Sequence, residues 1–281
     1  MKKKRIIVIG GSAAGPKAAS RARRLDENAE ITIIQKAPEL SMASCGYPYY
    51  VAGVFDDRNQ LLATPAGLVR DSNFFWDAKR IKALVNTEVT KIDRDNKRVE
   101  YKNLLTGETS SLPYDKLVIA TGATPFKPPV PGIDLKGVTT LQSMADSDFL
   151  RKIGDEGEVK NAVVIGGGLI GIETCEALVL SDIEVTLVEL LPQLLPFLDK
   201  DMSLHVEKYL KTKANVILNN AVAEFIGENG KLKAVKLQDG TIIPCEIAVV
   251  ATGVRPNINL AKEAGLKIGE CRAIEVNSYM Q

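Results

Sequence analysis

The chain has 281 residues, and 36 lysines and arginines against 35 aspartates and glutamates give it a formal net charge of +1. This balance argues against a nucleic-acid binder that depends on a broad basic surface, and no apolar run approaches the roughly 20 residues of a membrane helix. The basic start runs into a strand without the apolar region of a signal peptide, and the four widely spaced cysteines form neither a disulfide framework nor a zinc site. We therefore expect a soluble, cytoplasmic protein of about two domains.

The first predicted unit is a strand, a glycine loop, a helix and a second strand. Residues 5–11 (RIIVIGG) are apolar and β-rich, 13–25 have a helical pattern, and 31–34 predict a second buried strand. The loop keeps the outer glycines of a dinucleotide-binding turn, and a serine replaces the middle one, in the run Gly10-Gly11-Ser12-Ala13-Ala14-Gly15. At the end of the second strand, Gln35 and then Lys36 stand where an acidic ribose partner is expected. Glutamine still offers hydrogen bonds, without the charge.

A cysteine-bearing segment, SMASCGYPYY, follows this unit at residues 41–50. Ser44-Cys45-Gly46, with a proline two residues further on, predicts a loop that enters a helix. At such a helix start the backbone amides and the macrodipole favour a thiolate. The alternative is a buried structural cysteine, the more common role of a lone Cys. The polar, glycine-bearing loop favours the reactive interpretation.

Short strands and a proline-rich crossing separate this segment from the next repeat. Alternating runs at 89–92 and 98–101 predict strands with a turn at Thr106-Gly107, and 117–120 predicts another strand. Residues 124–132 (TPFKPPVPG) carry four prolines. This density of breakers predicts a crossing between domains.

The second repeat has the more complete motif. Residues 161–168 (NAVVIGGG) predict a strand, which is followed by a helix over 169–180 and a strand over 184–188. Gly166-x-Gly168-x-x-Gly171 opens that helix, and Glu189 ends the second strand. The glycines allow a tight turn, close approach of a pyrophosphate and close helix–sheet packing, while the helix N-terminus favours the phosphates. A glycine turn without a ligand is the alternative.

Glu189 predicts the cofactor of this second site. Its carboxylate can accept from both ribose hydroxyls but repels a 2′-phosphate, and no Lys or Arg follows it, so NADH is favoured over NADPH. Two dinucleotide sites in one chain suggest FAD first and NADH second. Further on, Asp199 is a candidate cap for a helix through 211, and Asp239-Gly240 predicts a hairpin between 231–237 and 241–243.

The repeated strand–loop–helix–strand pattern predicts an α/β protein with parallel sheets and tandem Rossmann-like dinucleotide-binding domains. We predict an FAD-binding domain with the active-site cysteine at 1–125, an NAD(P)H-binding domain at 126–250, and a return segment to the FAD domain at 251–281.

With these motifs the chain resembles the single-cysteine branch of the flavin-dependent pyridine nucleotide–disulfide oxidoreductases, over essentially its whole length. The resemblance rests on both glycine loops, the SMASCGYPYY segment, Ala120-Thr121-Gly122, and Ala251-Thr252-Gly253 with Arg255-Pro256-Asn257. It is most similar to coenzyme A–disulfide reductases and NADH-dependent persulfide or polysulfide reductases. The resemblance implies that Cys45 is the redox-active residue beside the flavin, and that both A-T-G segments pass near the cofactors.

The choice of branch follows from a few positions. Oxygen- and peroxide-reducing relatives carry a histidine in the first glycine loop, where this chain has Ala13; the single histidine, His205, is expected to be a surface or packing residue. NADH oxidase or peroxidase is therefore the alternative. Positions near the coenzyme A site of disulfide-reducing relatives are occupied by Arg21, Arg24, Ser41 and Ser44. Arginine forks suit phosphates, although the two arginines also fit a solvated helix face.

The predicted mechanism uses one catalytic residue, Cys45, with FAD, NADH and a small-molecule disulfide or polysulfide. Coenzyme A is the expected substrate or mixed-disulfide partner, and its own thiol replaces the missing resolving cysteine. Cys175, Cys245 and Cys271 lack the spacing to act as resolving partners. The residues assigned to the two cofactors are Gly10, Gly11, Ser12, Ala13, Ala14, Gly15, Gln35, Lys36, Val89, Ala120, Thr121, Gly122, Gly166, Gly168, Leu169, Ile170, Gly171, Glu189 and Gly253.

The C-terminus raises a different alternative, a nucleotide-binding fragment without turnover. Residues 273–277 match a family strand that returns to the FAD domain, and Gln281 precedes the family's next motif, Thr-Ser…Ala-x-Gly-Asp. The family's dimerisation domain would follow that motif. We therefore expect a C-terminally truncated chain. A full-length relative, which keeps the dimerisation domain, is expected to be a homodimer.

Overall fold

The computed structural model describes residues 3–281 and divides them into two compact units. The first unit combines the residues up to Ala43 with 57–123 and 256–281, and the second combines Ser44–Asp56 with Thr124–Arg255. The sequence predicts boundaries at 125 and 250 and places Cys45 in the first domain. In the structure the segment 44–56 groups with the second unit, because its short helix packs on two helices there.

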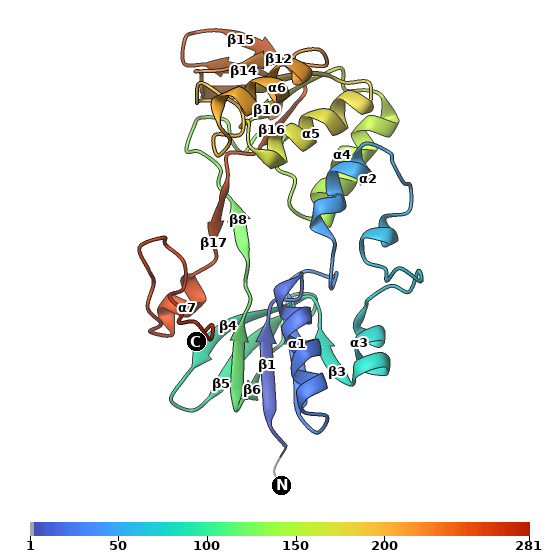
Figure 1. Cartoon of the computed structure of the whole chain (residues 1–281), viewed down its shortest axis with the longest axis vertical. Coiled ribbons are helices and arrows are strands. Elements are labelled where there is room, and N and C mark those ends of the chain that lie inside the picture. Colours follow the sequence, from blue (N-terminus) through green and yellow to red (C-terminus); the bar gives the residue numbers. More distant parts are fainter. Residues whose placement is uncertain (1–2) are drawn as a thin grey trace. The chain divides into compact units, whose positions relative to one another are not determined.

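The first unit is built on a four-stranded parallel sheet with two helices on one face (Figure 1). Its elements are β1 (Arg5–Ile9), α1 (Ala14–Leu25), β2 (Glu30–Ile34), α3 (Ser72–Lys79), β3 (Ile81–Leu84) and β7 (Lys116–Ile119), and the strand order is β3-β2-β1-β7. Successive side chains of a strand point to opposite faces. Val8 therefore packs with Phe75 of α3 and Ala19 of α1 in one core cluster, while Ile7 and Ile9 pack in another.

A three-stranded antiparallel sheet covers the opposite face of this parallel sheet. The antiparallel strands are β4 (Thr87–Asp93), β5 (Arg98–Asn103) and β6 (Thr109–Pro113), and the short helix α7 (Asn259–Glu263) packs beside β4. Ile92, Val99 and Tyr114 join the cluster that contains Ile7 and Ile9. Both faces of the parallel strands are thus buried, as continuous apolar strands require.

The second unit repeats this plan with a five-stranded parallel sheet. Its elements are β9 (Val138–Thr139), α4 (Met144–Glu156), β10 (Asn161–Ile165), α5 (Leu169–Leu180), β11 (Glu184–Val188), α6 (Lys200–Leu210), β12 (Asn215–Ile217) and β16 (Ile247–Val250), and the strand order is β12-β11-β10-β16-β9. The antiparallel strands β13 (Val222–Glu228), β14 (Lys231–Leu237) and β15 (Ile242–Pro244) pack on it through one apolar cluster that includes Val163, Phe225 and Val250.

Short elements occupy the stretches where the chain leaves one unit for the other. They are a 3-10 turn at Ser44–Gly46, α2 (Tyr47–Val51), a second 3-10 turn at Arg58–Leu61, and the paired strands β8 (Ala123–Pro125) and β17 (Val254–Pro256). Within residues 3–281 no helix combines the length and apolar character that a membrane crossing needs.

One local prediction is confirmed only in part, and another is wrong. Asp199 is the N-cap residue of α6, as predicted, but its side chain makes no cap hydrogen bond. Residues 273–277 form no strand; an isolated bridge between Ile268 and Ile274 is the ladder contact there. The sequence Ala-Ile-Glu-Val-Asn has strand character, but in this chain it has only this short local partner rather than the edge of a sheet.

Candidate functional site

The two glycine loops have the same geometry at their first glycine. Gly10 has φ +107°, and a Cβ there would lie 2.0 Å from the carbonyl oxygen of Ala120. Gly166 has φ +110°, and its Cβ would lie 2.5 Å from the carbonyl oxygen of Ala251. Both the backbone conformation and the space therefore exclude a side chain. In each unit the loop consequently lies against the A-T-G segment that follows the neighbouring strand.

The last glycine of each motif brings the helix onto the loop. A Cβ on Gly15 would lie 1.9 Å from the carbonyl oxygen of Gly10, and a Cβ on Gly171 would lie 1.9 Å from that of Gly166. These contacts place the starts of α1 and α5 directly over their loops. The first N–H groups of a helix have no intrahelical acceptor, so each helix start can receive a phosphate.

The middle glycine of the second loop has no structural reason within the protein. Gly168 has extended backbone angles, φ −79° and ψ −176°, and a Cβ there would meet no atom within 4 Å. Any residue would fit the protein alone at this position. A glycine is required only if a ligand lies against the backbone, as a pyrophosphate does. The first loop has Ser12 at the equivalent position, and its side chain is exposed.

The side chain that ends the second strand holds each loop in place. Gln35 is buried, and its Oε1 accepts a hydrogen bond of 2.8 Å from the Gly11 N–H. Glu189 is also buried: its Oε2 accepts from the Gly167 N–H and its Oε1 accepts from the Leu191 N–H at 2.7 Å. A carboxylate has lone pairs left after two such bonds, so Glu189 keeps acceptor capacity for a ribose. Sequence reasoning missed this loop-holding role.

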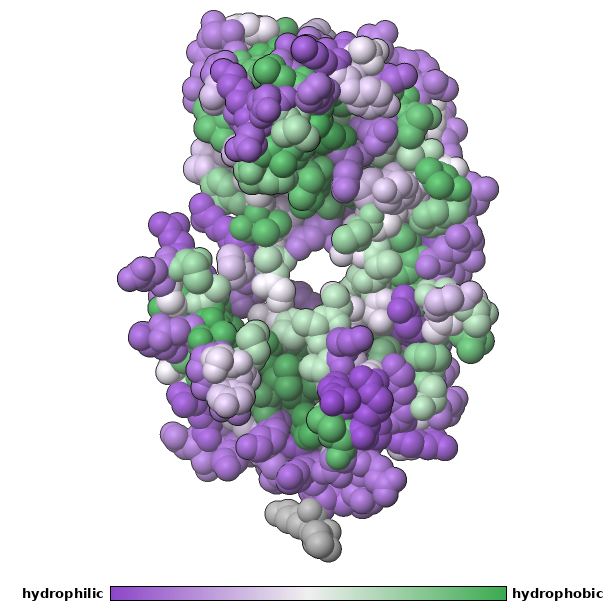
Figure 2. All heavy atoms as spheres, in the orientation of Figure 1, coloured by the Kyte–Doolittle hydropathy of each residue, from purple (hydrophilic) through white to green (hydrophobic). Residues whose placement is uncertain are grey.

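A cleft of about 670 Å³ lies beside the second loop. Glycine-loop residues, Leu169 and Ile170 of α5, and the residues that follow β11 and β16 line it. Among the described lining residues Glu189 is the one charged side chain. Figure 2 shows hydrophobic side chains gathered on this unit, over the elements labelled α6, β10 and β14 in Figure 1. The volume and the apolar lining suit a cofactor-sized ligand, and the single carboxylate suits a ribose diol without a 2′-phosphate.

Hydrogen bonds with Asn257 hold the first A-T-G segment, and hydrogen bonds with Phe126 hold the second. Thr121 Oγ1 donates to the carbonyl oxygen of Asn257 at 2.8 Å, and Asn257 Nδ2 donates to the carbonyl oxygen of Thr121 at 2.8 Å. The Asn257 N–H donates to the carbonyl oxygen of Gly122, which has φ +66°. In the second unit, Thr252 Oγ1 donates to the carbonyl oxygen of Phe126 at 2.7 Å, and the Phe126 N–H donates to that of Gly253.

Two predicted cofactor residues occupy peripheral positions in the first unit. Lys36 is exposed, and its Nζ lies 2.8 Å from Glu88 Oε1, so its charge is already paired. Val89 is a half-buried residue of β4 that packs against the cluster of Ile7 and Ile9. Ala13 and Ala14 are exposed at the start of α1.

Of the four basic side chains of α1, one makes structural hydrogen bonds and three form an exposed row. Arg23 donates to the carbonyl oxygens of Lys79 and Arg80 and so ties α1 to the end of α3. Lys17, Arg21 and Arg24 are exposed and recur at the i, i+4, i+7 spacing of one helix face.

Lys79 extends this cluster from α3. Its Nζ donates to Ser20 Oγ at 2.9 Å. Burial lowers the pKa of Lys79, and the positive charges of Arg24, Arg70 and Lys17 lower it further. We call Lys17, Arg21, Arg24, Arg70 and Lys79 the basic cluster. The sequence predicts a site role for Arg21 and Arg24 but names none for Lys17, Arg70 or Lys79; Lys79 lies far along the chain on α3, where no local pattern connects it to α1.

Cys45 lies in the 3-10 turn that leads into α2, and both it and Ser44 are exposed. Ser41 belongs to the first unit, where its N–H donates to the carbonyl oxygen of Gly11 at 2.7 Å. Within the described chain no group of three metal-ligating side chains is present.

The other thiols differ from Cys45 in their surroundings. Cys175 and Cys245 are buried, and burial first, then the neighbouring glutamate, raises the pKa of each to about 12. Cys271 is exposed. His205 is exposed on α6, as expected.

Two units that each carry a glycine loop on a parallel sheet, with a dinucleotide-sized cleft in the second, define a tandem dinucleotide-binding protein of Rossmann-like architecture. Residues 4–281 match the model of the pyridine nucleotide-disulphide oxidoreductases, and the chain belongs to this family. It is 38% identical to an NADH oxidase of Methanocaldococcus jannaschii, over 99% of this chain and 60% of that protein. It is 35% identical to an NAD(P)H coenzyme A polysulfide/persulfide reductase of Pyrococcus horikoshii, again over 99% of this chain and 60% of the relative.

A solved structure, that of an NAD-dependent persulfide reductase from A. fulgidus, has the same fold. It superimposes with a TM-score of 0.95 and is 42% identical, over 99% of this chain and 51% of that one. The chain spans about 60% of the length of the curated relatives it matches.

Proposed function

We propose that this protein uses NADH and FAD to reduce coenzyme A disulfide, or a related persulfide or polysulfide, through Cys45. The observation that carries the proposal is the combination of two dinucleotide-binding loops with one exposed cysteine at the start of a short helix. Relatives named for coenzyme A–dependent persulfide, polysulfide and disulfide reduction support the substrate class.

The second unit is the proposed NADH site. Gly166, Gly168 and Gly171 would admit the pyrophosphate to the backbone, and the start of α5 at Leu169 and Ile170 would supply N–H donors. Glu189 would accept from the ribose diol of NADH and repel the 2′-phosphate of NADPH. Gly253 would lie at the edge of the cleft.

The first unit is the proposed FAD site, and its residues fit the group. The loop Gly10–Gly15 repeats the geometry of the second loop, and Gln35 repeats the loop-holding hydrogen bond. Ala120, Thr121 and Gly122 adjoin the loop at the same edge of the sheet as their counterparts in the second unit. When bound, FAD would supply the chemistry that takes a hydride from NADH and passes two electrons to a disulfide.

Cys45 is the proposed nucleophile. Its thiolate would attack one sulfur of coenzyme A disulfide, form a Cys45–coenzyme A mixed disulfide and release one coenzyme A thiolate. Two electrons from NADH then reduce the mixed disulfide and, with one proton, free the second coenzyme A thiol. The net reaction consumes one NADH, one proton and one disulfide, and it yields NAD⁺ and two thiols. Ser41, which precedes this turn, and Ser44, its first residue, are the proposed substrate contacts.

The basic cluster is the proposed phosphate site for coenzyme A. Cations held close together and partly buried repel one another, and this repulsion contributes to the lowered pKa of Lys79. Phosphates placed there would relieve that repulsion and accept charge-assisted hydrogen bonds from Arg21 and Arg24. The alternative is a solvated helix face for Lys17, Arg21 and Arg24, with Lys79 held by Ser20 and by the Phe74 and Phe75 rings.

A second candidate, NADH oxidase activity, is favoured by the relative of that name from M. jannaschii. Against it, the exposed loop position 13 holds alanine, and His205 belongs to α6 in the second unit. Neither supplies a proton-transferring imidazole in the first loop.

Anaerobic titration with NADH, followed by coenzyme A disulfide, tests the proposal. We expect NADH to bleach the visible flavin absorption of FAD-loaded protein and the disulfide to restore it, with Cys45→Ser blocking only the restoration. Reoxidation by oxygen alone, unaffected by Cys45→Ser, would support the oxidase. Colourless protein that binds NADH but takes up no FAD would contradict both.

A further inference from the structure

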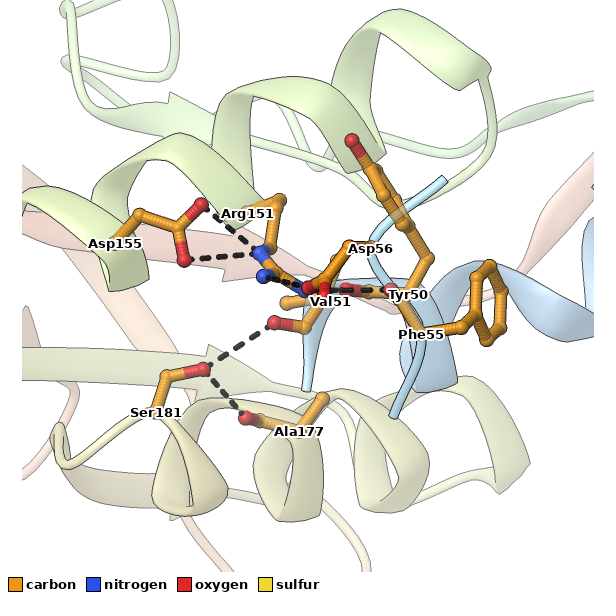
Figure 3. A network of polar contacts seen from close by, with 8 residues as sticks. All are labelled: Tyr50, Val51, Phe55, Asp56, Arg151, Asp155, Ala177 and Ser181. Atoms are coloured by element: carbon orange, nitrogen blue, oxygen red, sulfur yellow. Dashed lines mark hydrogen bonds and ion pairs between the residues drawn. The ribbon is translucent and has the colours of Figure 1, made fainter. Parts of the chain in front are cut away.

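We propose that Arg151 is the positioning residue that fixes the Cys45 segment, residues 44–56, to the NADH-binding unit. The proposal rests on the proposed role of Cys45. This segment packs on α4 and α5 through α2, and Arg151 of α4 makes polar contacts with its Tyr50, Phe55 and Asp56 (Figure 3).

Each nitrogen of the Arg151 guanidinium has an acceptor. Nε donates to both carboxylate oxygens of Asp155 at 2.9 Å, which orients the group along its own helix. Nη1 donates to the carbonyl oxygens of Tyr50 at 3.1 Å and Phe55 at 3.4 Å, and Nη2 donates to Asp56 Oδ1 at 2.8 Å. One side chain of α4 thus binds the end of α2 and the loop that follows it.

The contact is enclosed rather than exposed. The Arg151 side chain is only 16% exposed, and its guanidinium lies 5.7 Å from the Tyr50 ring centroid. The centroids of the Tyr50 and Phe55 rings lie 5.8 Å apart. Gly53 has φ +73°, and a Cβ there would lie 3.2 Å from Arg151 Nη1, so the turn is shaped around the guanidinium.

Ser181, at the end of α5, provides a second and weaker attachment. Its Oγ lies 3.3 Å from the carbonyl oxygen of Val51 and 3.1 Å from that of Ala177 (Figure 3). A single shared hydroxyl does not replace the fork of Arg151. Loss of the guanidinium would take a donor from the carbonyl oxygen of Phe55, leave that of Tyr50 with backbone donors such as the Gly53 N–H, and break the ion pair to Asp56, which favours detachment of the loop.

The attachment of α2 through Arg151 has a consequence for the position of the Cys45 thiol. Cys45 lies two residues before Tyr47, the first residue of α2, and five residues before the Arg151-bound Tyr50, so the position of α2 sets the position of Cys45. Because α2 is attached to the unit that binds NADH, the reactive sulfur follows that unit. Arg151 would then affect disulfide turnover without touching either cofactor or substrate.

An alternative explanation is that Arg151 merely stabilises α4 through its i,i+4 pair with Asp155. Two substitutions separate these roles. Arg151→Met keeps the aliphatic stem and removes all donors, while Arg151→Lys keeps a charge that can reach fewer acceptors. Lys152→Ala is the matched control, since the adjacent Lys152 makes only an exposed i,i+4 pair with Glu156.

The primary measurement is amide hydrogen exchange of residues 47–54 at the peptide level. We expect exchange about tenfold faster in Arg151→Met, an intermediate rate in Arg151→Lys and the wild-type rate in Lys152→Ala, with amides of β10 and β11 unchanged. A factor of ten is what the loss of one well-placed charged hydrogen bond produces. Wild-type exchange of residues 47–54 in Arg151→Met, or equal acceleration throughout the second unit, would overturn the proposal. Should Arg151→Met fail to fold, Arg151→Lys decides instead, since it keeps the charge and loses the fork that reaches several acceptors, and wild-type exchange of residues 47–54 in that variant would equally overturn the proposal.

The second measurement is turnover of FAD-loaded protein on coenzyme A disulfide. We expect Arg151→Met to lower kcat about tenfold while the KM for NADH and the NADH-driven flavin bleaching stay at wild-type values. Weaker NADH binding with unchanged kcat would overturn the positioning role. If wild-type protein reduces no disulfide, the proposed function fails, and the exchange data still decide whether Arg151 holds the segment.

Discussion

The two nucleotide-binding units solve one geometric problem with different side chains. In each, the first and last glycines of the loop lie against a carbonyl oxygen, and the residue that ends the second strand accepts a hydrogen bond from the loop. Gln35 performs this task in the first unit and Glu189 in the second. Holding the loop therefore needs an acceptor oxygen, whereas the negative charge of Glu189 is free to discriminate between ligands.

The largest effect is expected from the last glycines, where the units are most alike. Gly15→Ala and Gly171→Ala each push a methyl group to 1.9 Å from a carbonyl oxygen, and we expect each to lower the free energy of unfolding by about 3 kcal/mol. Urea denaturation of both variants measures this loss. A stable Gly171→Ala variant beside an unfolded Gly15→Ala variant would show that the two loops are not equivalent.

Glu189 separates the loop-holding role from the charge. Glu189→Gln removes the charge and keeps one acceptor oxygen, so one of the two N–H groups that Glu189 binds loses its acceptor. We expect stability to fall by about 1 kcal/mol, NADH to bind more weakly and NADPH to bind more tightly. Glu189→Ala leaves the Gly167 and Leu191 N–H groups buried and unpaired, which costs about 1–3 kcal/mol of stability. Calorimetric binding of the two nucleotides, with thermal melts, distinguishes these outcomes. Tighter binding of NADPH than NADH by the wild type would contradict the assignment.

Gly168, the middle glycine of the second loop, allows a test of nucleotide binding without a change in packing. Gly168→Ala fits the protein without a clash, so the free energy of unfolding should stay within about 0.5 kcal/mol of wild type. We expect NADH binding to weaken about tenfold, equivalent to ~1.4 kcal/mol, because the methyl group would meet the pyrophosphate. The matched change in the first loop, Ser12→Ala, should leave FAD binding close to wild type.

The two buried thiols of the second unit should make its stability depend on pH in the alkaline range. This effect is expected to be smaller than those above. Cys175 and Cys245 both belong to the second unit, and burial raises the pKa of each to about 12 from a model-peptide value of 9.0. Unfolded thiols release protons above pH 9 while the folded ones keep theirs, so stability falls as pH rises from about 9 towards 12.

We expect a loss of about 1 kcal/mol per thiol between pH 9 and 10. Denaturation at several pH values, compared with Cys175→Ala, measures the loss, and an identical pH profile for that variant would refute it. In the native protein at pH 8, Cys45 should be alkylated faster than Cys175 and Cys245.

The sequence predicts best what depends on neighbouring residues. The strand–glycine–helix spacing around Gly166 and the acidic end of β11 are local patterns, and the structure contains both elements within a residue or two of the predicted bounds. Arg151 and Lys79 contact residues far away in the chain, and no local pattern marks them. Asn257 belongs to a motif, but its hydrogen bonds to Thr121 cannot be predicted from that motif. Chain order predicts that segment 44–56 belongs to the first domain. In the structure it groups with the second unit, because α2 packs on α4 and α5.

The discontinuity of the units has a consequence for synthesis on the ribosome. The second unit's stretch 124–255 emerges as one piece, and its partner 44–56 has already left the exit tunnel by then. The first unit must wait longer, because Asn257 and α7, which hold Thr121 and pack beside β4, are translated after the second unit's stretch. The first unit begins before the second and is completed after it, and a chain released before residue 257 would lack the hydrogen bonds that close the A-T-G segment of the first unit.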